Sequence, residues 1–143
     1  MKDRVTTLPR GVVLALALAW SLGVFLLAHA EAQSVLYPGQ SLTLNQSLTS
    51  ENGRYVLAMQ ADGNLVLYRT SDGQALWWSD THGHAVSQAV MQYDGNFVIY
   101  GYYDPLWASH TDGRPGAYLA LQNDGNAVIY QPNVPVWASD TYE

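Results

Sequence analysis

The chain repeats one polar pattern three times, as QADGNLVLY (60–68), QYDGNFVIY (92–100) and QNDGNAVIY (122–130). We call this pattern, Gln-x-Asp-Gly-Asn-x-Val-x-Tyr, the signature. Its carboxylate, two amides and phenol can donate and accept hydrogen bonds at short range. A ligand covered with neighbouring hydroxyl groups, each of which donates and accepts, suits such a set, and a sugar has that chemistry.

Period-two geometry separates the signature from the core. Along residues 64–68 of an extended strand, Asn64, Val66 and Tyr68 share one face and the residues between them share the other. The alternating pairs are Leu65 and Leu67, Phe97 and Ile99, and Ala127 and Ile129. These pairs vary in size, as core positions do, whereas the polar face recurs unchanged. The alternative to a binding face is simple duplication of a hairpin that has good turn and strand residues. Duplication explains the recurrent glycines well but the recurrent glutamines poorly.

Short strands must carry each signature. Residues 54–60 and 64–68 alternate around Asp62-Gly63, a strong hairpin signal, and a third strand is expected near 75–79. Residues 35–53 are expected to add further strands. No helical period occurs after residue 32, so the sequence predicts an all-β domain over residues 33–143 with three internal repeats.

A second motif, Trp-x-Ser-x-Thr, follows each signature as WWSDT (77–81), WASHT (107–111) and WASDT (137–141). From the signature glutamine to the tryptophan the interval is 17 residues in the first repeat and 15 in the others. We therefore expect a two-residue insertion near residues 71–74. The corresponding connections, 101–105 and 131–135, both end in proline, which suits a turn.

The N-terminus has the order of a secretory signal peptide. Basic residues precede an apolar run over 11–27, and small residues follow at Ala28, Ala30 and Ala32. We expect cleavage after Ala30 or Ala32 and a secreted or extracytoplasmic protein. The alternative, a retained anchor, is disfavoured because 17 apolar residues are at the short limit for spanning a bilayer.

Composition excludes several functions. Residues 33–143 hold three arginines, no lysine and ten acidic residues, a net charge of −7. Such a surface cannot neutralise a row of phosphates, so neither nucleic acid nor an anionic membrane is an expected partner. The chain has no cysteine, which excludes thiol catalysis and zinc–thiolate sites.

The signature and the tryptophan motif resemble those of the monocot mannose-binding lectins, also called bulb-type lectins. The resemblance covers nearly all of residues 33–143. It implies a β-prism II fold, with three four-stranded antiparallel sheets around a pseudo-threefold axis and Trp77, Trp107 and Trp137 meeting in the core. It also implies that the protein binds α-D-mannose and mannose-rich glycans or polysaccharides, with avidity from up to three sites.

The resemblance assigns a role to each signature residue. Asp62 and Asn64 would bind the axial 2-hydroxyl of mannose, Gln60 the 3-hydroxyl and Tyr68 the 4-hydroxyl, while Val66 would pack on the ring. The second site would comprise Gln92, Asp94, Asn96, Val98 and Tyr100. The third site would comprise Gln122, Asp124, Asn126, Val128 and Tyr130.

Plant members of the family often carry a cysteine pair and exchange C-terminal strands in dimers. The absence of cysteine here favours a non-plant member, and a homodimer stays open. No cofactor, metal or catalytic residue is expected, because each signature offers one carboxylate and glycosidases typically use two across the scissile bond. His82 and His84 alone are a weak metal signal. The alternative function is a toxin-like or protein-interaction module that uses sugar binding only for targeting.

Overall fold

The computed structural model describes residues 32–143, which fold entirely from strands and turns. The first sheet contains, in spatial order, β1 (Val35–Leu36), β10 (Tyr118–Leu121), β11 (Ala127–Gln131) and β12 (Val134–Ala138). The second contains β2 (Ser41–Leu42), β7 (Val86–Met91), β8 (Phe97–Gly101) and β9 (Pro105–Ala108). The third contains β3 (Ser47–Thr49), β4 (Tyr55–Met59), β5 (Leu65–Arg69) and β6 (Ala75–Trp78).

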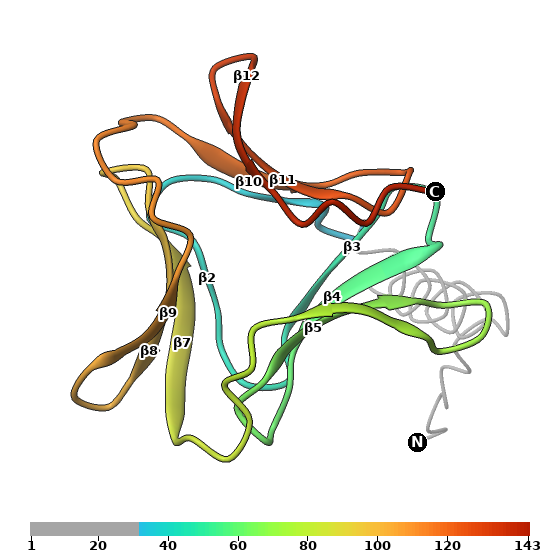
Figure 1. Cartoon of the computed structure of the whole chain (residues 1–143), viewed down its shortest axis with the longest axis horizontal. Helices are drawn as coiled ribbons and strands as arrows, with labels where there is room; N and C mark the ends of the chain where they lie inside the picture. The colour runs from blue at the N-terminus through green and yellow to red at the C-terminus, as the bar shows by residue number, and fades with distance from the viewer. Residues whose placement is uncertain (1–31) are drawn as a thin grey trace, which may run out of the picture. The chain divides into compact units, whose positions relative to one another are not determined.

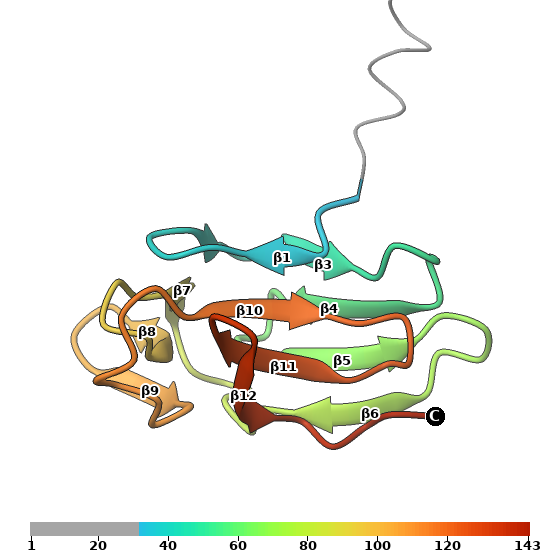
Figure 2. The ribbon, with the colours of Figure 1, turned by 90° about the horizontal axis from the view of Figure 1, so that it is seen from above.

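The three sheets form the three sides of a prism. All neighbouring strands are antiparallel, and the sheets surround a common centre in Figure 1. In the turned view, the strands of each sheet stack along the prism axis and run across it (Figure 2). The predicted β-prism II fold, with three four-stranded sheets, is confirmed.

The N-terminal segment contributes one strand to each sheet in turn. β1 pairs with β10, β2 with β7 and β3 with β4. These three short strands lie at the same end of the prism, where β1 and β3 are labelled in Figure 2. Residues 35–49 therefore link all three sheets, although they carry no signature.

The interior is filled by the side chains predicted to face inward. Leu65, Leu67 and Ile99 are fully buried, and Phe97 and Ala127 are 2% exposed. Burial of one such large apolar side chain stabilises the fold by roughly 1.5–3 kcal/mol. Leu65, Phe97 and Ala127 hold the same position in the three repeats and share one interior. A large side chain from one sheet can therefore face a small one from another.

The three motif tryptophans meet as predicted. Trp77 lies 5.5 Å from Trp107 and 5.8 Å from Trp137, and Trp107 lies 5.8 Å from Trp137, measured between ring centroids. Every pair is close to edge-on, with interplanar angles of 75–81°. Aromatic pairs favour this geometry, because the positive edge of one ring faces the negative face of the next.

The two-residue insertion lies in the β5–β6 turn. Tyr68 pairs with Ala75, seven residues on, whereas Tyr100 pairs with Pro105 and Tyr130 with Pro135, five residues on. The expectation that the prolines end turns is wrong. Pro105 is the first residue of β9 and Pro135 the second of β12. β9 and β12 are both edge strands of their sheets, where a missing backbone N–H is tolerated.

The expected signal peptide falls in residues 1–32 and so lies, apart from Ala32, outside the described residues. Within residues 32–143 there is no helix long and apolar enough to cross a bilayer.

Candidate carbohydrate-binding sites

Each signature lies on the central hairpin of one sheet. The first occupies β4–β5, the second β7–β8 and the third β10–β11. We call the three clusters the first, second and third sites. Within each site the glutamine and aspartate come from the end of one strand and its turn, and the valine and tyrosine from the return strand. All fifteen predicted residues are thus gathered as three groups of five.

The aspartate and glycine build the hairpin turn. In the first site the Asp62 Oδ1 accepts a hydrogen bond of 2.9 Å from the Asn64 N–H. Gly63 between them has a φ of +88°, and a Cβ there would lie 2.3 Å from the His84 carbonyl oxygen. Only glycine fits this position. The same aspartate bond, at 2.9 and 3.0 Å, occurs in the second and third sites.

The tryptophan motif fixes the signature asparagine. The Asn64 Oδ1 accepts hydrogen bonds from the Ser79 hydroxyl, at 3.1 Å, and from the Thr81 N–H, at 3.2 Å. The Ser79 hydroxyl also accepts the Leu65 N–H and lies 2.7 Å from the Thr81 hydroxyl, which donates to the Gly63 carbonyl. Equivalent bonds join Ser109 and Thr111 to Asn96, and Ser139 and Thr141 to Asn126.

The signature glutamine and tyrosine are also joined. The Gln60 Nε2 donates to the Tyr68 hydroxyl oxygen at 2.6 Å. The corresponding distances are 2.7 Å from Gln92 to Tyr100 and 2.6 Å from Gln122 to Tyr130. Because the phenol oxygen accepts this bond, its own proton is available to donate elsewhere.

These bonds leave the same groups unused in every site. Among residues 32–143, the aspartate Oδ2 and glutamine Oε1 have no donor, and the asparagine Nδ2 and tyrosine O–H have no acceptor. Every fully buried side-chain nitrogen or oxygen of that region has a partner, so the unused groups face solvent. The three aspartates are exposed and form no ion pair within the described chain. Each site therefore presents two acceptors and two donors.

The signature valine forms the floor of each site. Val66, Val98 and Val128 lie on the outer face of their sheets, yet each is only 3% exposed. A sugar ring could touch only a small part of such a side chain. The valine therefore supports the polar residues around it at least as much as it offers a surface of its own.

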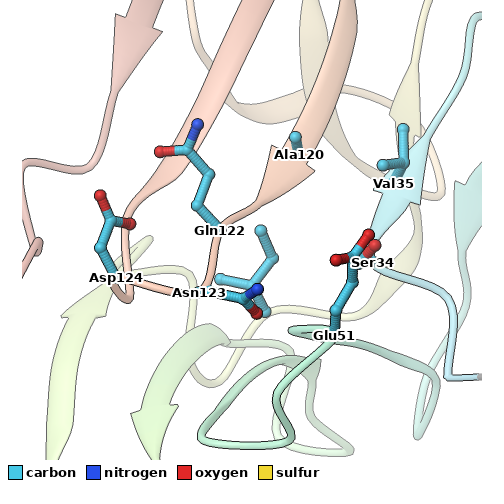
Figure 3. A pocket seen from close by; sticks show the side chains of 8 residues that line it. Ser34, Val35, Glu51, Ala120, Gln122, Asn123 and Asp124 are labelled. Atoms are coloured by element: carbon cyan, nitrogen blue, oxygen red, sulfur yellow. The ribbon is translucent and has the colours of Figure 1, made fainter.

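The sites differ in their surroundings. The first opens into a shallow depression of about 300 Å³ whose rim includes Trp78, Asp80 and His82. The third adjoins a hollow of about 450 Å³ that Gln122 and Asp124 line together with Glu51, Ser34 and neighbouring residues (Figure 3).

The serines and threonines of the tryptophan motif belong to the sites, although they were not predicted to do so. Their recurrence at fixed distances from Trp77, Trp107 and Trp137 was the available signal. Within residues 32–143 no group of three or more His, Cys, Asp or Glu side chains is arranged to hold a metal ion.

No family model matches the chain. Among curated proteins, a mannose-specific lectin from Narcissus pseudonarcissus is 41% identical over 68 residues, which cover 47% of this chain and 59% of that lectin. The chain spans about half the length of the curated relatives it matches.

Solved structures match over a greater length. The monomeric monocot mannose-binding lectins from Gastrodia elata share 41% identity, with 78% of this chain and 100% of that chain covered and a TM-score of 0.68. The snowdrop (Galanthus nivalis) agglutinin complexed with methyl-α-D-mannoside shares 38% identity, covering 78% of this chain and 99% of that one with a TM-score of 0.63.

A three-sided prism with one hydrogen-bonding cluster on each sheet is the architecture of a β-prism lectin. The sequence identity and coverage shared with the solved structures narrow this class to one family. The chain belongs to the monocot mannose-binding, or bulb-type, lectin family.

Proposed function

We propose that the protein is a lectin that binds α-D-mannose and mannose-rich glycans through its three signature sites. The observation that carries the proposal is the identical set of unused groups on each sheet: two acceptors and two donors around a covered valine. Vicinal hydroxyls both donate and accept, so they match this set. The mannose specificity of the Narcissus and snowdrop relatives supports the same ligand.

The aspartate and asparagine give the site its selectivity. In the first site the unused Asp62 Oδ2 accepts and the Asn64 Nδ2 donates, so together they can hold one hydroxyl from two directions. The axial 2-hydroxyl of mannose suits this role. An equatorial epimer such as glucose would leave both groups unpaired, and unpaired polar groups at a binding site cost about 1–3 kcal/mol.

The protein acts by binding and not by catalysis in this proposal. Each site holds a single aspartate, and the three sites lie on different sheets. A glycosidase typically places two carboxylates across one scissile bond, and no site offers that pair. One sugar held by a few exchangeable bonds should bind weakly, at roughly millimolar concentration, so useful affinity would come from several sites acting together.

We further propose that the protein is exported after removal of residues 1–30 or 1–32. The basic, apolar and small-residue order of that segment supports this. Mass spectrometry of the exported protein should find Glu31 or Gln33 at its N-terminus.

Competition tests the main proposal. The protein should bind immobilised mannan, and free mannose at high concentration should release it while glucose should not. Binding that free mannose leaves unchanged would contradict the sugar-binding role and favour a protein-interaction surface instead.

A further inference from the structure

Trp78 has no counterpart in the other repeats. It pairs with Val66 across β5 and β6. The equivalent positions of the second and third sites, opposite their own signature valines, hold Ala108 and Ala138. The first site therefore differs from the others by one large aromatic side chain beside its floor.

The Trp78 ring lies on the site face and is half open to solvent. Directly paired residues of antiparallel strands share a face, so Trp78 lies on the site face with Val66, while Trp77 turns to the core. Trp78 is 53% exposed, and it forms no ring–ring contact within residues 32–143. The exposed half of this indole is an available apolar surface.

Trp78 belongs to the same hollow as the first site. The depression of about 300 Å³ is lined by the five signature residues together with Trp78, Asp80 and His82. Asp80 and His82 are exposed, and the His82 Nδ1 lies 3.6 Å from the Asp80 Oδ1. Asp80 and His82 thus add polar groups to the depression that the indole also lines.

We propose that Trp78 is a platform for the second sugar ring of a mannose oligosaccharide whose terminal mannose occupies the first site. This rests on the proposed lectin function. A pyranose has faces formed by C–H groups and a rim of hydroxyls. The C–H groups would pack on the indole, whose face is electron-rich, and the rim hydroxyls would reach Asp80 and His82. The second site, with Ala108 at this place, gains nothing from a second ring.

The test isolates the first site. Asp94→Ala and Asp124→Ala together silence the other two, and the protein is titrated with methyl α-mannoside and with the α1→2, α1→3 and α1→6 mannobioses. At least one mannobiose should bind about tenfold tighter than the monosaccharide. Trp78→Ala should remove this preference and leave monosaccharide affinity within about twofold, whereas Trp78→Phe should keep part of it. Thermal unfolding of each variant checks that it is folded.

The second site provides the matched control. With Asp62→Ala and Asp124→Ala it should bind all these sugars alike, and adding Ala108→Trp should create the mannobiose preference. Trp78 fluorescence gives an independent measurement: a mannobiose should shield the indole from acrylamide, an effect absent in Trp78→Phe.

The outcomes separate the two proposals. If methyl α-mannoside binds the first site but no mannobiose is preferred, or if Trp78→Ala keeps the preference, the platform is wrong and the lectin function stands. If methyl α-mannoside binds none of the sites, the lectin function fails and the platform fails with it.

Discussion

At the residue scale, the signature is completed by side chains outside it. Ser109 is 7% exposed, and its hydroxyl accepts the Phe97 N–H at 2.9 Å and donates to the Asn96 Oδ1 at 3.1 Å. It thereby orients the Asn96 amide so that its N–H groups face outward. The serines contribute to the sites without being positioned to touch the ligand themselves.

Ser109→Ala should therefore destabilise the protein and weaken the second site. The Phe97 N–H would lose its side-chain acceptor in a buried place, at a cost of about 1–3 kcal/mol in the free energy of unfolding. Ser139→Ala is the matched control, since Ser139 makes the same bonds in a half-buried place where water can replace it. Urea unfolding measures both variants, and an equal loss would contradict the explanation.

The signature glycine should resist substitution more than other glycines with positive φ. Gly95 has a φ of +93°, and a Cβ there would lie 2.2 Å from the Arg114 carbonyl oxygen. Gly113 has a φ of +78° and no atom within 4 Å of that point. Gly113→Ala should lower the free energy of unfolding by about 1–2 kcal/mol, because of its backbone conformation alone. Gly95→Ala should lower it clearly more, because the added Cβ also meets the Arg114 carbonyl. Thermal unfolding that ranks the two the other way would show that the close approach does not matter.

The signature residues and the core were predictable at this scale because their pattern is local. Period two separates Asn64 from Leu65 without knowledge of the fold. The bond from Ser79 to Asn64 was not predictable in the same way. It joins residues 15 apart, and it depends on the register of β5 and β6, which the bulge between Leu67 and Tyr68 shifts.

At the element scale, the β5–β6 turn is held by charge. The Arg69 guanidinium donates to both Asp72 carboxylate oxygens, at 2.7–3.2 Å, and also contacts Glu143. The hydrogen bonds from Arg69, with a smaller contribution from the Gln74 backbone N–H, hold the pKa of Asp72 below its usual value. The Arg69 pKa is raised chiefly by Asp72 and then by Glu143.

This turn should lose its charge contacts in acid. A carboxyl group whose pKa is lower in the folded state stabilises the fold above its unfolded pKa, near 4, and the effect disappears as the pH falls through the folded value. Asp72→Asn should therefore unfold at a lower temperature than the native protein at about pH 7, and the difference should vanish by about pH 2. A difference that persists in acid would exclude ionisation of Asp72 as the cause.

The positions of the strands were easier to predict from the sequence than the pairing between strands. The three hairpins and the two-residue insertion follow from turn residues and spacing. That β1, β2 and β3 join three different sheets does not follow from local pattern, because β1 pairs with a strand 83–85 residues away and β2 with one 47–49 residues away. The proline positions were mistaken for turns because a proline at the start of an edge strand has the same local signal.

At the scale of the whole molecule, the C-terminus returns to the first repeat. The Tyr55 hydroxyl donates to a Glu143 carboxylate oxygen at 3.2 Å, and the C-terminus lies beside β4 in Figure 1. The common core and the central tryptophans join the three sheets, so the three sites lie on one body and face away from the axis in different directions. Rigid placement of several weak sites favours clustered or branched ligands, or crosslinking of surfaces.

Loss of the three signature aspartates should abolish binding in steps. Each single change among Asp62→Ala, Asp94→Ala and Asp124→Ala should weaken binding to immobilised mannan, and the triple variant should not bind. Several sites engaged together raise apparent affinity by about 10²–10⁴, so the loss should be far larger on mannan than for free monosaccharide. If one single change removes all binding, only one site is functional.

Nuclear magnetic resonance of the asparagine side chains tests the central claim most directly. The amide groups of Asn64, Asn96 and Asn126 should shift when methyl α-D-mannoside is added, with half-saturation at roughly millimolar sugar. Methyl α-D-glucoside at the same concentration should leave them in place. Asparagine signals that do not respond to the mannoside, or that respond equally to both sugars, would contradict three mannose sites built from the signature.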